Sequence, residues 1–192
     1  MNAGGESRLG PLGDRPLLIG TLILTAAGVA MIYSAGQVDF SSAVTGVWKR
    51  QILWAVLAFG GMWAVSRVPL RWMDWAAPYM YGISVFLLAL TLFVGTGPGG
   101  TTSWLELGPL RMQPAELAKL STILMLAREL SGRREPAERL SELGRPLAIA
   151  LAPLFLVMLQ PDLGSALIFG VILVAALFWA GVPLFTIFLL VS

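Results

Sequence analysis

Long apolar runs separated by short polar segments constrain this chain more than any other feature. They cover residues 17–34, 51–66, 75–94, 114–130, 147–159 and 164–180, and a shorter run extends from residue 183 to 192. A helix of about 20 apolar residues crosses the hydrocarbon core of a bilayer. Only 12% of the residues are charged, about half the share found in soluble domains. The pattern therefore predicts an all-α, polytopic transmembrane helical bundle.

The spacing of the runs predicts one integral membrane domain over residues 1–192, with six full spans and a partial seventh. We expect the chain to be truncated there, because a half-span leaves backbone groups unpaired in lipid. Residues 1–16 are predicted to form a cytoplasmic tail, residues 95–113 an extracytoplasmic loop and residues 131–146 a cytoplasmic loop. The glycine-rich opening of the outer loop, residues 95–100, is predicted to be flexible.

The basic residues predict the orientation. With the N-terminus in the cytoplasm, nine of the 13 Arg and Lys residues lie in cytoplasmic segments and four in outer segments. This bias follows the positive-inside rule. The four outer residues are Lys49, Arg50, Arg111 and Lys119.

The chain contains no cysteine and no histidine, which excludes thiolate or imidazole metal sites and nucleophiles that depend on His. Any metal would be a hard ion held by oxygen ligands or substrate phosphates. A net charge of only +2 gives no reason to expect a nucleic-acid partner.

A first polar interruption lies at the predicted outer end of the fourth run. Pro114 suits the first turn of a helix, Glu116 follows in that turn, and Lys119 lies three residues later on the same face. A helix cap with a snorkelling lysine is the simpler interpretation. In the functional interpretation, Glu116, Lys119 and Arg111 face a polar cavity, because charges at membrane depth usually mark a site. Two cations with one carboxylate would suit a phosphate head group.

A second interruption separates the fifth and sixth runs. The 34 residues from 147 to 180 would form a helix about 51 Å long, too long for one crossing. Pro161 ends the first helix, and Asp162 then precedes the next helix, where an N-cap is the simpler role. Both interruptions fall on the predicted outer side. We therefore expect one outward-facing polar site.

At these two places the sequence resembles the SEDS family of shape, elongation, division and sporulation proteins, which includes RodA and FtsW. Residues 103–108 (S-W-L-E-L-G) and 111–119 (R-M-Q-P-A-E-L-A-K) resemble the signature R-W-L/I-x-L-G followed by Q-P-S-E-x-x-K. Residues 160–166 (Q-P-D-L-G-S-A) resemble a second signature of the family. Ser103 and Ala115 depart from the pattern, which usually has arginine and serine there.

The resemblance implies a peptidoglycan glycosyltransferase that polymerises lipid II into glycan strands outside the bacterial plasma membrane. It implies a ten-span fold, of which this chain matches the first six spans and part of the seventh. It also places the main catalytic aspartate in an outer loop beyond residue 192, so this fragment alone is expected to be inactive. A class B penicillin-binding transpeptidase is the implied partner. Leu163 and the first span favour a RodA-type role in elongation and cell shape over an FtsW-type role in division.

The resemblance and the charge pattern together assign roles within this chain. Supporting catalytic roles are expected for Glu116, Lys119 and Asp162. Substrate binding is expected for four residues: Trp104, Arg111, Gln113 and Gln160. A divalent cation such as Mg²⁺ is a further expectation, bridging phosphate to Glu116 or Asp162.

Two other functions fit parts of the pattern. A flippase or transporter for the lipid-linked precursor is one, because broken helices near the membrane midplane are also a transporter feature. The largely apolar inner halves of the runs favour an outward-facing enzyme instead. A noncatalytic scaffold that activates the penicillin-binding protein is the other.

Overall fold

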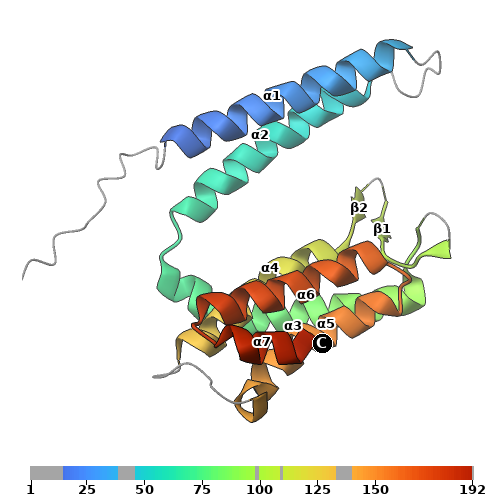
Figure 1. Cartoon of the computed structure of the whole chain (residues 1–192). Coiled ribbons are helices and arrows are strands. Elements are labelled where there is room, and N and C mark those ends of the chain that lie inside the picture. Colours follow the sequence, from blue (N-terminus) through green and yellow to red (C-terminus); the bar gives the residue numbers. More distant parts are fainter. Residues whose placement is uncertain (1–14, 39–45, 98–99, 109, 133–139, 192) are drawn as a thin grey trace, which may run out of the picture. The chain divides into compact units, whose positions relative to one another are not determined.

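The computed structural model describes residues 15–38, 46–97, 100–108, 110–132 and 140–191. These residues form seven α-helices, a short 3-10 helix and a two-stranded sheet (Figure 1). In chain order they are α1 (Arg15–Val38), α2 (Val47–Ser66), α3 (Leu70–Val94), β1 (Leu105–Leu107), β2 (Leu110–Met112), α4 (Pro114–Ser131), η2 (Leu140–Leu143), α5 (Gly144–Met158), α6 (Leu163–Trp179) and α7 (Leu184–Val191). Each α-helix coincides with one apolar run, which confirms the predicted helical fold.

Large parts of the helix surfaces are apolar. Large apolar side chains are exposed along α1, α3 and α6, up to 85% for Phe93 and Trp179, and an apolar surface of this kind is unfavourable in water. By length and composition alone, residues Arg15–Gly36 and Leu70–Val94 are long and apolar enough to cross a membrane. The apolar helices α5 and α6 are shorter. The predicted count of six full spans and a partial seventh stays a prediction.

The chain divides into two compact units, Met1–Val68 and Pro69–Ser192. The single domain expected from the sequence stays a prediction. In the first unit α1 and α2 pack side by side (Figure 1). The rings of Tyr33 and Trp48 meet edge to face at 5.6 Å between centroids, close to the connection between the two helices.

In the second unit, small residues allow close packing of α3 with α4 and α5 with α6. Ala115 and Ala118 of α4 are fully buried, and Ala166 of α6 is 5% exposed. They belong to one apolar cluster that also contains Leu88, Val157 and Phe169, drawn from α3 to α6. Small side chains at helix interfaces are typical of membrane bundles, where close backbone approach supplies the packing energy.

A proline inside α5 leaves one carbonyl for another helix to use. Pro153 has no N–H to donate to Ile149 O, four residues earlier. The Tyr81 hydroxyl of α3 donates to this carbonyl at 2.9 Å. The tyrosine thus satisfies a backbone group that would otherwise be unpaired inside the bundle.

A proline inside α3 has the same effect. Pro78 leaves Asp74 O without its donor in the helix, and the Arg128 guanidinium at the end of α4 donates to this oxygen at 2.7 Å. The Asp74 carboxylate lies 3.8 Å from the same guanidinium. Two helices are therefore joined at one end through a carbonyl that a proline has freed.

The loop between α3 and α4 contains a short sheet, which the sequence did not predict. Strands β1 and β2 pair antiparallel, and Gly108 in their connection adopts φ +64°, a conformation that favours glycine. Before them, Thr96 and Trp104 exchange two backbone hydrogen bonds of 2.9 Å. A Cβ on Gly95 would lie 2.2 Å from Thr102 O, so glycine is required there. Gly95, Thr96 and Gly97 lie in this closely packed turn, and the flexible loop predicted over residues 95–100 stays a prediction.

Candidate functional site

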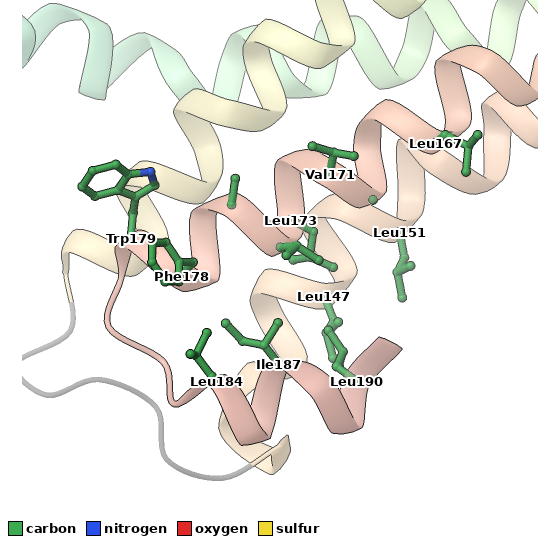
Figure 2. A pocket seen from close by; sticks show the side chains of 13 residues that line it. Leu147, Leu151, Leu167, Val171, Leu173, Phe178, Trp179, Leu184, Ile187 and Leu190 are labelled. Carbon is green, nitrogen blue, oxygen red and sulfur yellow. The ribbon is translucent and has the colours of Figure 1, made fainter. Parts of the chain in front are cut away.

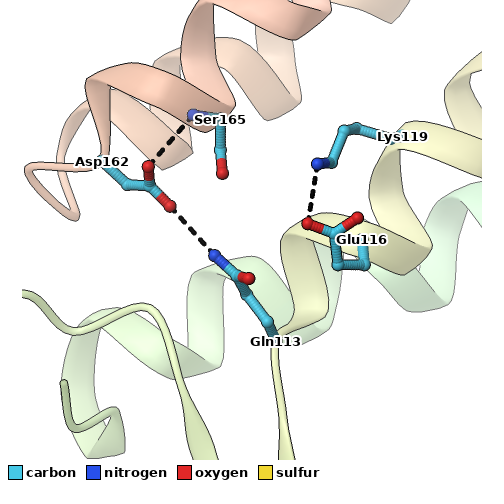
Figure 3. A network of polar contacts seen from close by, with 5 residues as sticks. All are labelled: Gln113, Glu116, Lys119, Asp162 and Ser165. Atoms are coloured by element: carbon cyan, nitrogen blue, oxygen red, sulfur yellow. Dashed lines mark hydrogen bonds and ion pairs between the residues drawn. The ribbon is translucent and has the colours of Figure 1, made fainter. Parts of the chain in front are cut away.

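The N-termini of helices α4 and α6 lie next to each other in space, and their N-cap residues are hydrogen-bonded to each other (Figure 3). Gln113 Nε2 donates to Asp162 Oδ2 at 3.0 Å. The other oxygen of Asp162 accepts from the Ser165 amide at 3.0 Å, in the first turn of α6. The predicted N-cap role of Asp162 is thereby confirmed. Both of its carboxylate oxygens are engaged, one by each helix.

Local sequence explains why the two helices begin here. Pro114 stands at the first position of α4, where a missing N–H costs nothing, and it keeps Gln113 in an extended conformation. Pro161 lies in the turn between α5 and α6, where the sequence predicted that the first of these helices would end. The carboxylate of Asp162 then pairs with an N–H group that has no partner in the first turn of a helix.

One turn into α4, Lys119 Nζ donates to Glu116 Oε1 at 2.7 Å, so the predicted pair is confirmed. The two side chains differ in exposure, at 14% for Lys119 and 62% for Glu116. Figure 3 shows Lys119 extending from α4 toward the start of α6. The lysine of this pair therefore has a mostly buried side chain, and its ammonium group is bound by a carboxylate of the same helix.

Gln160 shortly precedes Asp162 in the chain and is fully buried. Its amide nitrogen donates to Leu88 O at 2.9 Å and to Thr91 Oγ1 at 2.7 Å, both on α3. Its Oε1 has no partner among the described residues. In this geometry Gln160 braces the turn between α5 and α6 against α3, and the substrate contact expected for it stays a prediction.

The remaining two predicted residues, Trp104 and Arg111, lie on the β-hairpin. Arg111 forms an ion pair with Glu106, directly opposite in the other strand. The arginine and Lys119 therefore belong to separate ion pairs, although the sequence suggested that they act together. Glu106 was not predicted, because only the hairpin register brings it opposite Arg111.

The electrostatics of the hairpin pair favour a charged carboxylate. Hydrogen bonds from the side chains of Arg111 and Thr96, together with the arginine charge, lower the pKa of Glu106 below its ordinary value. Next to this pair lies a hollow of about 430 Å³ lined by Thr96, Gly97, Trp104, Glu106 and Arg111.

A second hollow contrasts with this one. A groove of about 830 Å³ runs along α5, α6 and α7 (Figure 2) and is lined by apolar side chains such as Leu151, Val171 and Trp179. No charged side chain lines this groove. In a membrane, a surface of this kind suits apolar chains rather than chemistry.

The carboxylates at the helix junction are poorly suited to hold a metal by themselves. Both oxygens of Asp162 already accept hydrogen bonds, and Glu116 adjoins an ammonium group that repels cations. Within the described ranges, three or more Asp, Glu, His or Cys side chains do not gather anywhere. Mg²⁺ in proteins is often held by one or two carboxylates and the substrate phosphates. The predicted divalent cation thus stays a prediction, and no step below depends on it.

Comparison with known proteins identifies the family. The model of the FtsW, RodA and SpoVE family, described as cell cycle proteins, matches residues 15–192. The chain belongs to the SEDS family. SEDS proteins are membrane proteins, in agreement with the exposed apolar surfaces of the helices. The predicted orientation of the chain stays a prediction.

The SEDS relatives include both functional types. A probable peptidoglycan glycosyltransferase FtsW of Aeromonas salmonicida is 35% identical over 89% of this chain and 44% of its own length. The crystal structure of rod shape determining protein RodA of Thermus thermophilus superposes with a TM-score of 0.71 at 34% identity, covering 89% of this chain and 58% of that chain. A structure of a peptidoglycan synthase complex that coordinates polymerization and crosslinking matches with a TM-score of 0.66 at 35% identity, covering 82% of this chain and 45% of that chain. The chain spans about half the length of the curated relatives it matches.

Proposed function

We propose that this SEDS chain is part of a peptidoglycan glycosyltransferase that polymerises lipid II into glycan strands. The names of the curated relatives support this activity. Because the chain spans about half their length, the proposal concerns the complete protein that contains it. We propose that the junction of α4 and α6 supplies the binding half of the site, and that the main catalytic aspartate implied by the SEDS signatures belongs to the rest of the complete protein.

The observation that carries the proposal is the hydrogen bond between the N-caps of α4 and α6. The N-terminus of a helix carries a partial positive charge and presents unpaired N–H groups, which suit a phosphate. Two such ends converge here, and the ammonium group of Lys119 extends toward them. During glycosyl transfer, negative charge grows on the departing diphosphate. Positive groups fixed in advance around that charge lower the barrier.

The carboxylates near this junction have supporting roles in the proposal. Asp162 is a positioning residue, because its two hydrogen bonds hold the start of α6 against α4. Glu116 orients the ammonium group of Lys119 through their ion pair. The acceptor hydroxyl requires a general base within hydrogen-bonding distance, and we assign that role to the aspartate implied beyond this chain.

The location and partner follow from the same proposal. We place the helix junction and the hairpin on the extracytoplasmic side of the plasma membrane, with the N-terminus in the cytoplasm, because the arginine distribution favours this orientation. A class B penicillin-binding transpeptidase is the proposed partner. Support comes from the matched synthase complex, which is described as coordinating polymerization and crosslinking.

Within the family we propose a RodA-type role in elongation and cell shape. Leu163 and the first span favour it, while the two comparisons are balanced, at 35% identity to an FtsW and 34% to a RodA. Rescue of rod shape in a strain depleted of its own elongation SEDS protein would support this role. Rescue of septation in a division-depleted strain, without restoration of rod shape, would contradict it.

The arrangement of the polar groups inside the bundle does not favour a flippase. Ser84 of α3 and Ser121 of α4 are both buried inside the bundle. Their hydroxyls are hydrogen-bonded to each other at 2.6 Å. Tyr81 likewise donates to a backbone carbonyl. These groups join helices, whereas a transport path needs polar groups that face a passage.

The test is polymerisation of purified lipid II by the complete protein together with its transpeptidase partner. We expect Lys119→Ala to lower the rate by about 100-fold, the usual cost of removing a group that stabilises transition-state charge. Glu116→Ala should also lower it, because the ammonium loses its partner. Leu117→Ala, at an exposed position of the same helix turn, is the matched control and should leave the rate unchanged. Full activity of Lys119→Ala would favour the simpler interpretation, in which Glu116 only caps the helix and Lys119 only extends to the membrane interface.

A further inference from the structure

The end of the second unit that lies away from the hairpin carries another polar hollow. Helix α4 ends there, and α5 begins there after the 3-10 helix η2 (Figure 1). The hollow has a volume of about 810 Å³, and its lining includes four charged residues: Arg128 and Glu129 of α4, Glu142 of η2 and Arg145 of α5. None of the four belongs to the helix junction or to the hairpin, so the proposed function gives this hollow no role.

The length of α4 relates this hollow to the membrane. The helix has 18 residues from Pro114 to Ser131, and a rise of 1.5 Å per residue makes it about 27 Å long. The hydrocarbon core of a bilayer is about 30 Å thick. A helix of this length that crosses the bilayer has its two ends in the two head-group layers. With the helix junction at one membrane surface, the hollow lies among the lipid head groups of the other.

The guanidinium groups of the hollow are available to an anion. Arg145 is exposed in the first turn of α5, and no hydrogen bond or ion pair joins its side chain to a residue that the structure describes. Arg128 donates to Asp74 O through Nη1, but a guanidinium has five N–H groups and keeps others for a ligand. The partial positive charge at the start of α5 also favours a phosphate at this place.

Two carboxylates give the hollow a mixed character. Glu129 and Glu142 balance the formal charge of the two arginines. A head group that carries only negative charge would be repelled by both carboxylates. Each carboxylate has two oxygens with about four acceptor positions, so it can hold an ammonium group in addition to its other partners. The charges of the hollow therefore match a ligand with both a phosphate and an ammonium group.

We propose that this hollow binds the head group of an aminophospholipid such as phosphatidylethanolamine, in which a short linker joins a phosphodiester to a primary ammonium group. Arg128 and Arg145 donate to the phosphodiester oxygens, and Glu129 and Glu142 accept from the ammonium group. Gly144 leaves the start of α5 accessible, since a Cβ there would meet nothing within 4 Å.

The position of the hollow favours a membrane lipid over a soluble phosphoester. Charged pockets between transmembrane helices at the membrane surface are a known setting for lipid head groups. This inference does not depend on the proposed glycosyltransferase activity, because the hollow and the helix junction lie at opposite ends of α4.

The test is binding of single lipids to this chain, measured by native mass spectrometry in a detergent that carries neither phosphate nor amine. Phosphatidylethanolamine, phosphatidylglycerol and phosphatidylcholine with the same acyl chains are compared. We expect saturable binding of phosphatidylethanolamine. Phosphatidylglycerol should bind about tenfold more weakly, because it has no ammonium group. Phosphatidylcholine should also bind more weakly, because its trimethylated nitrogen has no N–H to donate. Soluble glycerophosphoethanolamine, titrated by calorimetry, should bind more weakly than the lipid.

Variants locate the binding. Arg145→Gln is expected to weaken binding of phosphatidylethanolamine about tenfold, because a charge-assisted hydrogen bond to the phosphodiester is lost. Glu142→Gln should weaken binding of phosphatidylethanolamine without weakening that of phosphatidylglycerol. Arg71→Gln, at an exposed arginine in the first turn of α3 outside the hollow, is the matched control and should bind like the unmodified chain. Thermal unfolding of each variant shows whether it has kept its fold.

Four outcomes would overturn the proposal. They are no saturable binding of phosphatidylethanolamine, equal binding by a folded Arg145→Gln chain, equal binding of phosphatidylglycerol, and equal binding of soluble glycerophosphoethanolamine, which would make the ligand a soluble phosphoester. In the complete protein, Lys119→Ala should retain lipid binding while polymerisation falls. Failure of the lipid site and failure of the proposed activity are therefore distinguishable.

Discussion

At the scale of single residues, Asp162 connects the two helices of the candidate site. One carboxylate oxygen caps α6 and the other accepts from Gln113, so each oxygen has a structural use. A group that accepts two hydrogen bonds in this way can act by holding geometry, without taking a proton. Substitution by asparagine tests whether Asp162 acts through its geometry or through its charge, because asparagine keeps the shape of the side chain and removes the charge.

We expect Asp162→Asn to retain polymerisation within about tenfold, because its oxygen can still cap α6 and its amide can face Gln113 Oε1. Asp162→Ala should lower the free energy of unfolding by about 1–2 kcal/mol, through loss of the cap and of one hydrogen bond. Rates of lipid II polymerisation and thermal unfolding measure the two effects. If Asp162→Asn is as inactive as Lys119→Ala, the charge itself is needed.

Glu106 gives a pH dependence for the hairpin. Its pKa is lower in the folded chain than in the unfolded chain, because Arg111 and Thr96 stabilise the charged form. The contribution of the carboxylate is therefore complete above the unfolded-state pKa of about 4.3 and is lost as the pH falls through the folded-state value. We expect the melting temperature of the chain to fall over that acidic range as this contribution is lost. The melting temperature of Glu106→Gln should change less over the same range, and an equal loss in both would point to another group.

Spacing along the sequence decided which residue contacts could be predicted. Glu116 and Lys119 are three positions apart on a helix, so their pairing follows from helix geometry. Glu106 and Arg111 pair only because a tight turn sets their register. Gln160 was expected to meet substrate, yet its partners lie about 70 positions earlier on α3. Periodicity within one element carries no information about such distant partners.

At the scale of elements, the helices were predictable and the hairpin was not. Apolar runs of 13 to 20 residues can satisfy their backbones in lipid only as helices, and each run became one. Strands β1 and β2 have three residues each, with a single charged residue between apolar ones. A run this short gives no reliable period. The bonds to proline-freed carbonyls also escaped prediction, since their donors lie 54 and 68 positions away.

The bond between Tyr81 and Ile149 O provides a test at this scale. Tyr81→Phe removes the donor to a carbonyl that Pro153 has freed, and we expect it to lower the free energy of unfolding by about 1 kcal/mol. In a Pro153→Ala background the helix regains its own N–H donor, so the same change should cost less. Unfolding of the four proteins in mixed micelles completes a double-mutant cycle. Additive effects would show that the tyrosine contributes only by packing.

At the scale of the whole molecule, the membrane arrangement is the main open prediction. The chain has no cysteine, so a single introduced cysteine reports its own side of the membrane. Under the proposed orientation, Thr102→Cys in the loop between α3 and α4 should react with a membrane-impermeant maleimide in intact cells. Ser131→Cys, exposed at the end of α4, should react only after permeabilisation. The reverse pattern would invert the proposed orientation and place the helix junction inside the cell.

The proline-freed carbonyls also bear on the order in which the chain enters the membrane. If synthesis and insertion proceed from the N-terminus, α3 arrives before α5, so the Tyr81 hydroxyl is already present when the gap left by Pro153 reaches the bilayer. The Asp74 carbonyl must instead wait for Arg128 at the far end of α4. Until then it depends on water at the membrane surface. The order of the helices in the chain therefore matters for membrane insertion. An unpaired carbonyl in a newly inserted helix is bonded at once if its donor lies on an earlier helix. If its donor lies on a later helix, the carbonyl must stay at the membrane interface until that helix arrives.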